Sequence, residues 1–576
     1  MKKQSFLHGA LILTAGIILV KLIGALFKVP LTWIITEDGL GYFNTAYNFY
    51  GPIHSLAAAG FPIAISRLVS ENGTVRRYRD IRRIYRVSVP IFLITGTAGF
   101  LIMAVGAPLY ARAIGNPEAI PSLYALAPAV LFSCLISVYR GYYEGLRNMY
   151  PTAVSEILEA VGKLVIGLSL AWLIVSAAMR EYARFGTVFG AAVQSEEYAR
   201  SAALPFAAAG AVLGVTAGSV LAWIYMALRH KRRGDGITGE ELDGSPEPAP
   251  VWSVVARLVK TALPIGAGAL AVNVAGLVDS TFLQTRMNDV LESAPETVLG
   301  MYEGMIPQVN LETGTVPNFL FGCFSMALTL FMVVPSVTQA FGISALPNVT
   351  AAWTKGSREE LKHSMETVLR ITSLFCIPSG LGMCVLSGPV TALVFGERQS
   401  LPVTAHILAV LGIAAIFASL SAPLNSMLQA IGRVDLPVKI LAVGLALKVA
   451  LNYFLVGIPE INVMGAGAGT LACYLFLTIA ALILLRRETG IRLDLDSVFM
   501  RPAIASAVCC LAAFLLYSVL DGVLGIRIAA LAAVGGAVVV YVAALFGLRA
   551  IRRSDLLMLP KGQKLVKVLE KRGWIG

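Results

Sequence analysis

Residues 402–430 read PVTAHILAVLGIAAIFASLSAPLNSMLQA and contain no aspartate, glutamate, lysine or arginine. A helix needs about 20 predominantly apolar residues to cross the hydrocarbon core of a bilayer. This stretch is long enough, and comparable stretches recur along the chain of 576 residues. The whole chain is 57% hydrophobic and 14% charged, whereas soluble domains are about 45–50% apolar and about 25% charged. The composition excludes a soluble enzyme and predicts an all-α integral membrane protein.

The apolar stretches predict about fourteen transmembrane helices. They lie near residues 7–35, 41–70, 87–111, 119–146, 152–178, 199–229, 254–285, 317–346, 364–388, 402–430, 437–457, 463–485, 498–519 and 526–548. Lysine and arginine gather in alternate loops, for example within 76–86, 229–233 and 486–492. Because basic loops stay in the cytoplasm, this alternation predicts a multi-pass protein of the cell membrane with both termini cytoplasmic.

The formal net charge of +12 is spread over these short loops. Basic clusters at membrane surfaces contact anionic lipid headgroups. We therefore expect anionic membrane lipids, and no nucleic acid, as partners of the charged loops.

Residues 234–250 are polar and rich in glycine and proline, which predicts a mobile cytoplasmic linker. It separates an N-terminal six-helix lobe, 1–233, from a C-terminal six-helix lobe, 251–490. A terminal helix pair, 491–550, and a basic cytoplasmic tail, 551–576, complete the expected organisation. The lobes share a faint repeat, since Arg433 and Pro437 follow Arg147 and Pro151 at the same offset. Parallel repeats of this kind occur in secondary transporters.

Several motifs resemble those of one group of exporters. They are VKLIGALFKVP (20–30), GLGYFNTAY (39–47), AGFPIAISRLVSE (59–71), RGYYEGLRNMYPT (140–152), SALP (344–347) and LQAIGR (428–433). Together they resemble the polysaccharide-transport and stage V sporulation protein B branch of the multidrug/oligosaccharidyl-lipid/polysaccharide (MOP) exporter superfamily. The lipid II flippases form a neighbouring branch of that superfamily.

The resemblance implies two six-helix lobes around a central cavity, plus a terminal helix pair. It also implies a flippase working by alternating access, without enzymatic activity. Its cargo would be a lipid-linked oligosaccharide or peptidoglycan precursor on an undecaprenyl-type diphosphate. The lipid II flippases carry arginines where this chain has Lys21 and Lys28, and another near Leu330, which is uncharged here. A related lipid-linked saccharide is therefore the expected cargo.

Ionisable side chains within predicted spans are the candidate functional residues, because each costs at least about 2.5–3.5 kcal/mol at mid-membrane unless it faces a cavity or a partner. Lys21 and Lys28 are seven residues apart and share one helix face, where a cationic stripe would suit a diphosphate. The candidate substrate-binding residues are Lys21, Lys28, His54, Glu156, Glu159 and Lys163, and the candidate coupling-ion residue is Asp279.

Each candidate also has a structural interpretation. The lysines of the first span could extend toward the membrane surface. Glu159 and Lys163 could neutralise each other as an i,i+4 pair. His54 could be a satisfied core histidine, and Asp279 could hydrogen-bond to a neighbouring helix. The sequence alone leaves these alternatives open.

Other chemistries lack their motifs. The chain contains no Gly-x-x-x-x-Gly-Lys-Ser/Thr loop, no His-Glu-x-x-His and no Gly-x-Ser-x-Gly pattern. We therefore expect no cofactor, no metal and no direct ATP hydrolysis, with transport driven by a coupling ion or the membrane potential. A multidrug or cation antiporter on the same fold is the first alternative function, and a membrane-embedded glycan polymerase is the second.

The predicted topology can be tested with single cysteines and a membrane-impermeant thiol reagent in intact cells. A cysteine near position 300 should react from outside, whereas cysteines near 240 and 565 should react only after the membrane is opened. Labelling at 240 in intact cells would contradict the fourteen-span arrangement with internal termini.

Overall fold

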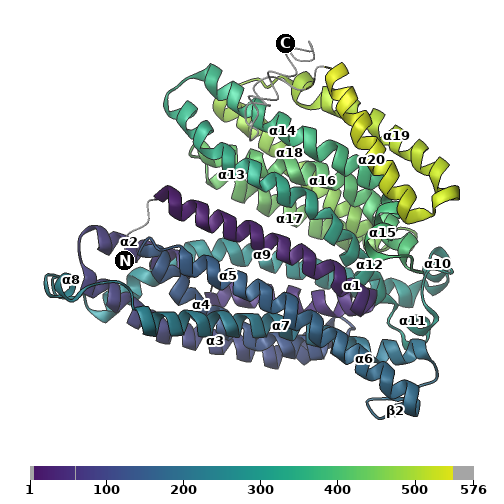
Figure 1. Cartoon of the computed structure of the whole chain (residues 1–576), viewed down its shortest axis with the longest axis horizontal. Coiled ribbons are helices and arrows are strands. Elements are labelled where there is room, and N and C mark those ends of the chain that lie inside the picture. Colours follow the sequence, from purple (N-terminus) through teal and green to yellow (C-terminus); the bar gives the residue numbers. More distant parts are fainter. Residues whose placement is uncertain (1–5, 59, 549, 551–576) are drawn as a thin grey trace. The chain divides into compact units, whose positions relative to one another are not determined.

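The computed structural model describes residues 6–58, 60–548 and 550, so the predicted basic tail 551–576 lies outside the described residues. Nearly all described residues are helical (Figure 1). Within this part of the chain, 12 helices are long and apolar enough to cross a membrane. One of them, Leu19–Thr74, covers the predicted span 41–70 and the second half of the predicted span 7–35. The predicted all-α membrane fold is therefore confirmed, with about 12–14 crossing helices against the fourteen expected.

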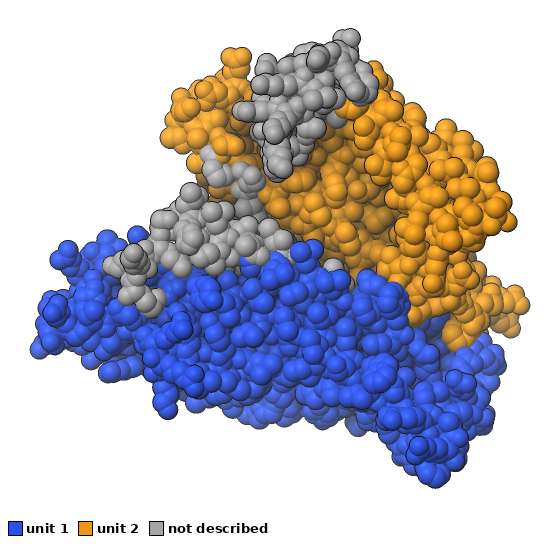
Figure 2. Space-filling view, viewed as in Figure 1, with its two compact units in different colours: residues 1–288, 308–322 blue, residues 289–307, 323–576 orange. Residues whose placement is uncertain are grey.

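The chain forms two compact units (Figure 2). Unit 1 contains residues 1–288 and 308–322, which include the following elements: α1 (Phe6–Ala58), α2 (Phe61–Thr74), α3 (Tyr78–Ala113), η1 (Pro117–Ala119), α4 (Ile120–Gly145), α5 (Tyr150–Gly162), η2 (Lys163–Gly167), α6 (Leu168–Phe185), β1 (Thr187–Val188), β2 (Ala191–Ala192), α7 (Glu196–Arg233), α8 (Gly239–Asp243), most of α9 (Val251–Ser293), α11 (Gln308–Thr313) and the start of α12 (Val316–Phe331).

Unit 2 contains residues 289–307 and 323–576. Its elements are the rest of α12, α10 (Pro295–Met301), α13 (Val333–Thr354), α14 (Arg358–Val385), α15 (Ser387–Phe395), α16 (Leu401–Ala430), α17 (Asp435–Val456), α18 (Met464–Thr489), η3 (Asp496–Met500), α19 (Arg501–Leu524) and α20 (Ile526–Gly547). The first boundary between the units lies near the end of α9, between Asn288 and Asp289, and not at the linker. The division into lobes 1–233 and 251–490 was drawn at the linker; these compact units do not test it, and it stays a prediction.

The first two predicted spans are joined without a loop. Helix α1 continues through residues 36–40, and its path changes at Thr36, whose φ of 55° lies in the left-handed region. The loop expected between the predicted spans 7–35 and 41–70 is thus a kink within one helix. Asp38 is buried there and accepts hydrogen bonds from the amides of Asn310, at 3.0 Å, and Asn318, at 3.2 Å. These bonds hold α11 and the start of α12 against α1 within unit 1.

Glycines allow α7 to pack closely against the helix formed by α5, η2 and α6. A Cβ on Gly214 would collide with the backbone of Gly167, and a Cβ on Gly218 would approach the Glu159 carbonyl oxygen to 2.5 Å. Small residues that let helix backbones approach are typical of membrane helix interfaces. The same contact places Glu159 and Lys163, on α5 and η2, beside α7.

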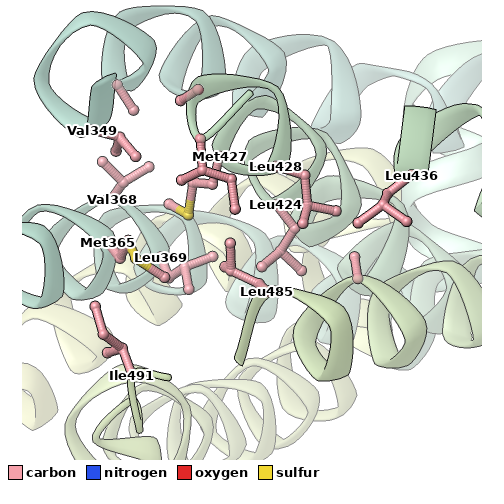
Figure 3. Close-up of a cluster of buried hydrophobic side chains, with 14 of the residues drawn as sticks. Val349, Met365, Val368, Leu369, Leu424, Met427, Leu428, Leu436, Leu485 and Ile491 are labelled. Atoms are coloured by element: carbon pink, nitrogen blue, oxygen red, sulfur yellow. The ribbon is translucent and has the colours of Figure 1, made fainter. Parts of the chain in front are cut away.

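The core of unit 2 is a cluster of buried, mainly aliphatic side chains contributed by α13, α14, α16, α17, α18 and η3 (Figure 3). Leu369, Leu424, Met427 and Leu428 are fully buried within it. Helices α19 and α20 pack on each other and contact α14 and α15. The terminal helix pair is thus attached to this unit through apolar contacts.

The linker 234–250 is held against unit 1, contrary to the predicted mobility. Its short helix α8 begins with a capping box between Thr238 and Glu241. Arg79 donates to the Leu242 carbonyl oxygen at 2.9 Å, and Arg83 donates to the Ala249 carbonyl oxygen at 2.6 Å. The arginines that were predicted to set topology therefore also bind the linker backbone.

The close contact between α7 and η2 predicts opposite effects for two glycine-to-alanine substitutions. Gly214→Ala should lower the melting temperature of the purified protein, because overpacking costs about 1–3 kcal/mol. A Cβ on Gly276 of α9 would meet nothing within 4 Å, so Gly276→Ala should leave stability unchanged or raise it through helix propensity. Equal melting temperatures for the two variants would contradict the described contact.

Candidate functional site

Lys163 lies inside unit 1 among three aromatic rings. Its Nζ is 4.7 Å from the ring centroid of Phe27, 4.9 Å from that of Tyr47 and 5.7 Å from that of Phe43. All three rings come from α1. Cation–π contacts of this kind stabilise a desolvated ammonium by about 2 kcal/mol or more. The rings stabilise the charge but leave the N–H donors of Lys163 available for an acceptor.

Lys163 also begins the π-helical turn η2, where the helix of residues 150–185 departs from regular α geometry. Such turns are frequent at functional sites of helices. The turn and the aromatic rings are two independent features of this position.

Glu159 pairs with an arginine of α4. Its Oε2 is 2.9 Å from Nη2 of Arg140, and its Oε1 accepts a hydrogen bond from the Ser219 hydroxyl at 2.8 Å. The structure thus pairs Glu159 with Arg140. The alternative i,i+4 ion pair between Glu159 and Lys163 is not found among the described residues. Lys163 remains close enough to Glu159 for a longer-range attraction.

Lys28 is half-buried on α1 and close enough to Lys163 for the two ammonium groups to repel each other. Within the described part of the chain, neither lysine lies within ion-pair distance of a carboxylate. Lys21, two turns earlier on α1, is exposed. The structure therefore brings Lys28 close to Lys163. These two lysines, Glu159 and His54 are called the lysine cluster below.

His54 is half-buried on α1, and its ring stacks on that of Tyr50 with the centroids 5.1 Å apart. The hydroxyl of Tyr50 lies 3.2 Å from the Ser133 hydroxyl of α4. His54 also lies within electrostatic range of Glu159 and Arg140. It belongs to the same cluster as Glu159.

The remaining two candidates lie on different helices. Glu156 is half-buried on α5, one turn before Glu159, and within electrostatic range of Arg140. Asp279 is half-buried on α9. Their roles in binding cargo or a coupling ion stay predictions.

Sequence reasoning missed the partners that define this cluster. Arg140 and Tyr47 both stand inside the motifs quoted above, but neither was recognised as a site residue. In the sequence, Phe27, Phe43 and Tyr47 look like ordinary apolar residues of a membrane span. Only the three-dimensional packing shows that these rings face an ammonium group.

Unit 2 contains an apolar groove with a volume of about 370 Å³. It runs between the α14–α15 segment and the α19–α20 pair. Among its lining residues are Phe375, Leu386, Ala513, Val538 and Tyr541. Such a surface suits a hydrocarbon chain, because apolar groups pack on it by van der Waals contact and leave no polar group unsatisfied.

Two family models match the chain. Residues 6–196 match the family described as polysaccharide biosynthesis protein, and residues 314–454 match the MatE family. The matched segments include the Lys28, His54, Glu159 and Lys163 cluster in the first case and helices α13 to α16 in the second.

Two curated relatives from Bacillus subtilis (strain 168) are similar to the chain. Lipid II flippase MurJ is 24% identical over 501 residues, covering 84% of each protein. Stage V sporulation protein B is 27% identical over 227 residues, covering 39% of each protein. The first similarity extends over most of both chains.

The fold is similar to a solved structure described as lipid II flippase MurJ in an inward closed conformation. The TM-score is 0.64 at 11% sequence identity, and the match covers 93% of this chain and 98% of the other. At this identity the likeness concerns the fold. Sequence motifs, family models and fold agree: the chain is a multi-pass membrane protein related to MurJ and stage V sporulation protein B, and its first third is similar to the polysaccharide biosynthesis family.

Proposed function

We propose that this transporter flips a lipid-linked saccharide, an oligosaccharide or peptidoglycan precursor on an undecaprenyl-type diphosphate, across the cytoplasmic membrane. Such a cargo combines an anionic diphosphate with a long hydrocarbon chain. The chain offers the lysine cluster in unit 1 and an apolar groove in unit 2, and each suits one part of the cargo.

The observation that carries the proposal is the state of Lys28 and Lys163. Their ammonium groups have no ion-paired carboxylate among the described residues, and Lys163 contacts the faces of aromatic rings, with Glu159 only at longer range. A charge-assisted hydrogen bond from ammonium to phosphate is stronger than a neutral one. Lysine holds phosphate as a point charge and without the two-pronged geometry of arginine, which suits a cargo that must also leave.

The apolar groove supports the same cargo. A hydrophilic or cationic substrate would gain nothing from the lining of Phe375, Leu386 and Val538. Lipid II is the cargo in the name of the related flippase, and the lysines in place of arginines favour a related saccharide here.

The main alternative is a multidrug or cation antiporter. A cation site would need a carboxylate free to receive the substrate. Glu159 is already paired with Arg140 and Ser219, which favours anionic over cationic cargo. Glu156 and Asp279 are the residues on which a cation site would have to rest.

Depletion of the protein in its own cells tests the proposal. A lipid-linked diphosphate saccharide should accumulate with its headgroup on the cytoplasmic leaflet, and its identity names the cargo. Unchanged pools of all lipid-linked saccharides, together with proton- or sodium-driven exchange of organic cations in vesicles, would favour the antiporter.

Lys28→Ala should reduce flipping to background while expression and melting temperature stay near wild type, because the diphosphate loses a charge-assisted contact. Lys28→Arg should keep substantial activity. Lys21→Ala, at the exposed position on the same helix face, is the matched control and should weaken flipping less, with His54→Ala intermediate. The measurement is headgroup accessibility of the lipid-linked precursor in cells or vesicles. If Lys28→Ala flips at the wild-type rate, Lys28 is a membrane-surface anchor.

A further inference from the structure

A basic pocket lies at one end of unit 1, away from the helices' midpoints. It has a volume of about 230 Å³ and lies among the start of α3, the ends of α4 and α7, and the start of the linker. Its lining includes Arg82, Tyr85, Arg86, Tyr142, His230 and Asp235. The pattern of basic loops predicts that this end faces the cytoplasm. The pocket is large enough for a group the size of a phosphate ester, since one water occupies about 30 Å³.

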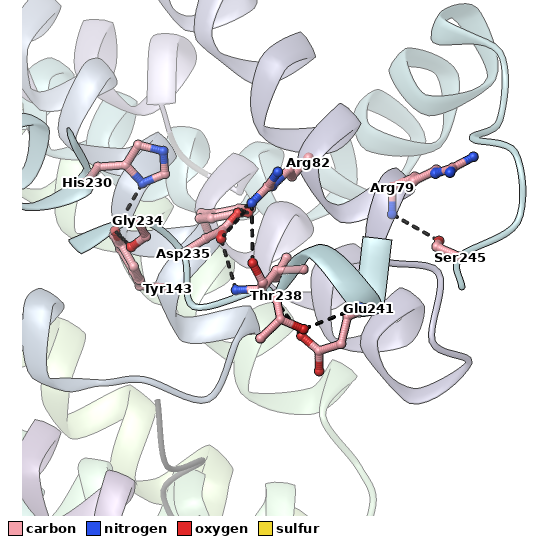
Figure 4. A network of polar contacts seen from close by, with 11 residues as sticks. Arg79, Arg82, Tyr143, His230, Gly234, Asp235, Thr238, Glu241 and Ser245 are labelled. Atoms are coloured by element: carbon pink, nitrogen blue, oxygen red, sulfur yellow. Dashed lines mark hydrogen bonds and ion pairs between the residues drawn. The ribbon is translucent and has the colours of Figure 1, made fainter. Parts of the chain in front are cut away.

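The Asp235 carboxylate accepts hydrogen bonds on one side of the pocket, and Figure 4 shows its contact with Arg82. Arg82 donates to Asp235 from Nε at 2.9 Å and from Nη2 at 3.3 Å, and the Tyr142 hydroxyl donates to the same carboxylate at 3.0 Å. Burial opposes ionisation of Asp235, but these bonds and one from the Ile237 backbone outweigh it and lower the pKa of its carboxyl group. Asp235 is therefore an anion that already occupies one side of the pocket.

The other cations have no such partner. Arg86 is exposed at the pocket wall, and no hydrogen bond or ion pair of its side chain is found among the residues described. Arg229 lies beside the pocket with its guanidinium 4.7 Å from the Tyr143 ring, and its buried Nε and Nη1 have no hydrogen-bond partner within the described part of the chain. With His230 neutral, the group Arg82, Arg86, Arg229 and Asp235 carries three positive charges and one negative charge.

Aromatic side chains fix this geometry. The ring of His230 lies 4.6 Å from that of Tyr85, measured between centroids, and its Nδ1 lies 3.0 Å from the Tyr143 hydroxyl. Tyr143 also donates to the Gly234 carbonyl oxygen at 3.0 Å. Packed rings limit the motion of the pocket wall, and the Tyr143 ring also holds the guanidinium of Arg229.

We propose that this pocket binds a phosphate group at the membrane surface, with Arg86 as its main ligand and Arg82 shared between that group and Asp235. Arginine suits phosphate because its planar donors can engage two oxygens. Phosphate reaches this position either on an anionic lipid headgroup, which basic clusters at the membrane surface attract, or on a soluble ester. The site is separate from the lysine cluster and does not depend on the identity of the cargo.

The test uses the full-length protein purified in detergent. Its melting temperature is followed against the concentration of a short-chain phosphatidylglycerol, with phosphatidylcholine of the same chain length as the headgroup control. Phosphatidylglycerol should stabilise the protein saturably and phosphatidylcholine should not. A second titration uses glycerol phosphate and distinguishes the two sources of phosphate. If glycerol phosphate stabilises the protein and the effect requires Arg86, the ligand is a soluble ester. If glycerol phosphate does not stabilise the protein, the ligand is the lipid headgroup.

Arg86→Gln should raise the half-saturating concentration about tenfold, the loss expected for one charge-assisted contact. Arg76→Gln is the matched control, because Arg76 is an exposed arginine of the same basic loop that does not line the pocket. It removes the same charge and should change the half-saturating concentration little. Equal effects of the two substitutions would overturn the proposal and indicate general attraction to a basic surface.

Asp235→Asn gives the opposite test, because it removes the carboxylate that competes for Arg82. Binding of phosphatidylglycerol, or of glycerol phosphate if that is the ligand, should tighten several-fold. Glu247→Gln changes the net charge equally within the linker, outside the pocket lining, and should have little effect. Unchanged binding in Asp235→Asn would contradict the shared role of Arg82.

Discussion

An ammonium group within a membrane-spanning helix costs at least about 2.5–3.5 kcal/mol at the bilayer centre unless its surroundings compensate, and unit 1 is built around two such groups. Lys163 is compensated by the faces of Phe27, Phe43 and Tyr47, and not by a described ion pair. The Lys163 ammonium group is thereby stabilised without being neutralised by a carboxylate. An anion entering this region meets N–H donors that no carboxylate of the described residues occupies.

The packing of neighbouring helices makes this arrangement possible. Gly214 and Gly218 bring α7 against α5 and η2, so Ser219 can reach Glu159 while Arg140 approaches the same carboxylate from α4. Because Glu159 is held by these two residues, the basic character of the Lys163 end is preserved. An ion pair between Glu159 and Lys163 would instead have neutralised the lysine. Helix packing and cargo chemistry are thus linked through the choice of partner for one carboxylate.

The spans and the candidate lysines could be predicted from the sequence, since long apolar runs and rare ionisable residues within them are local signals. The kink at Thr36 was predicted as a loop, because the polar pair Glu37 and Asp38 looks like a turn when its buried amide partners are unknown. Arg370 was not recognised at all. It lies near the middle of α14, inside the predicted span 364–388, and its side chain is fully buried. The partner of a buried charged or polar side chain is usually distant in sequence. A local sequence pattern therefore does not predict it.

The most direct test of the account is reconstitution of the purified transporter in liposomes that contain a fluorescent undecaprenyl diphosphate saccharide. Accessibility of the headgroup to a membrane-impermeant quencher or glycosidase is then measured over time, with and without an imposed ion gradient. The account predicts translocation that requires the protein, depends on the diphosphate, and is lost when Lys28 and Lys163 are both replaced by methionine. Liposomes in which no lipid-linked diphosphate crosses, or in which the doubly substituted protein flips as fast as the wild type, would contradict it.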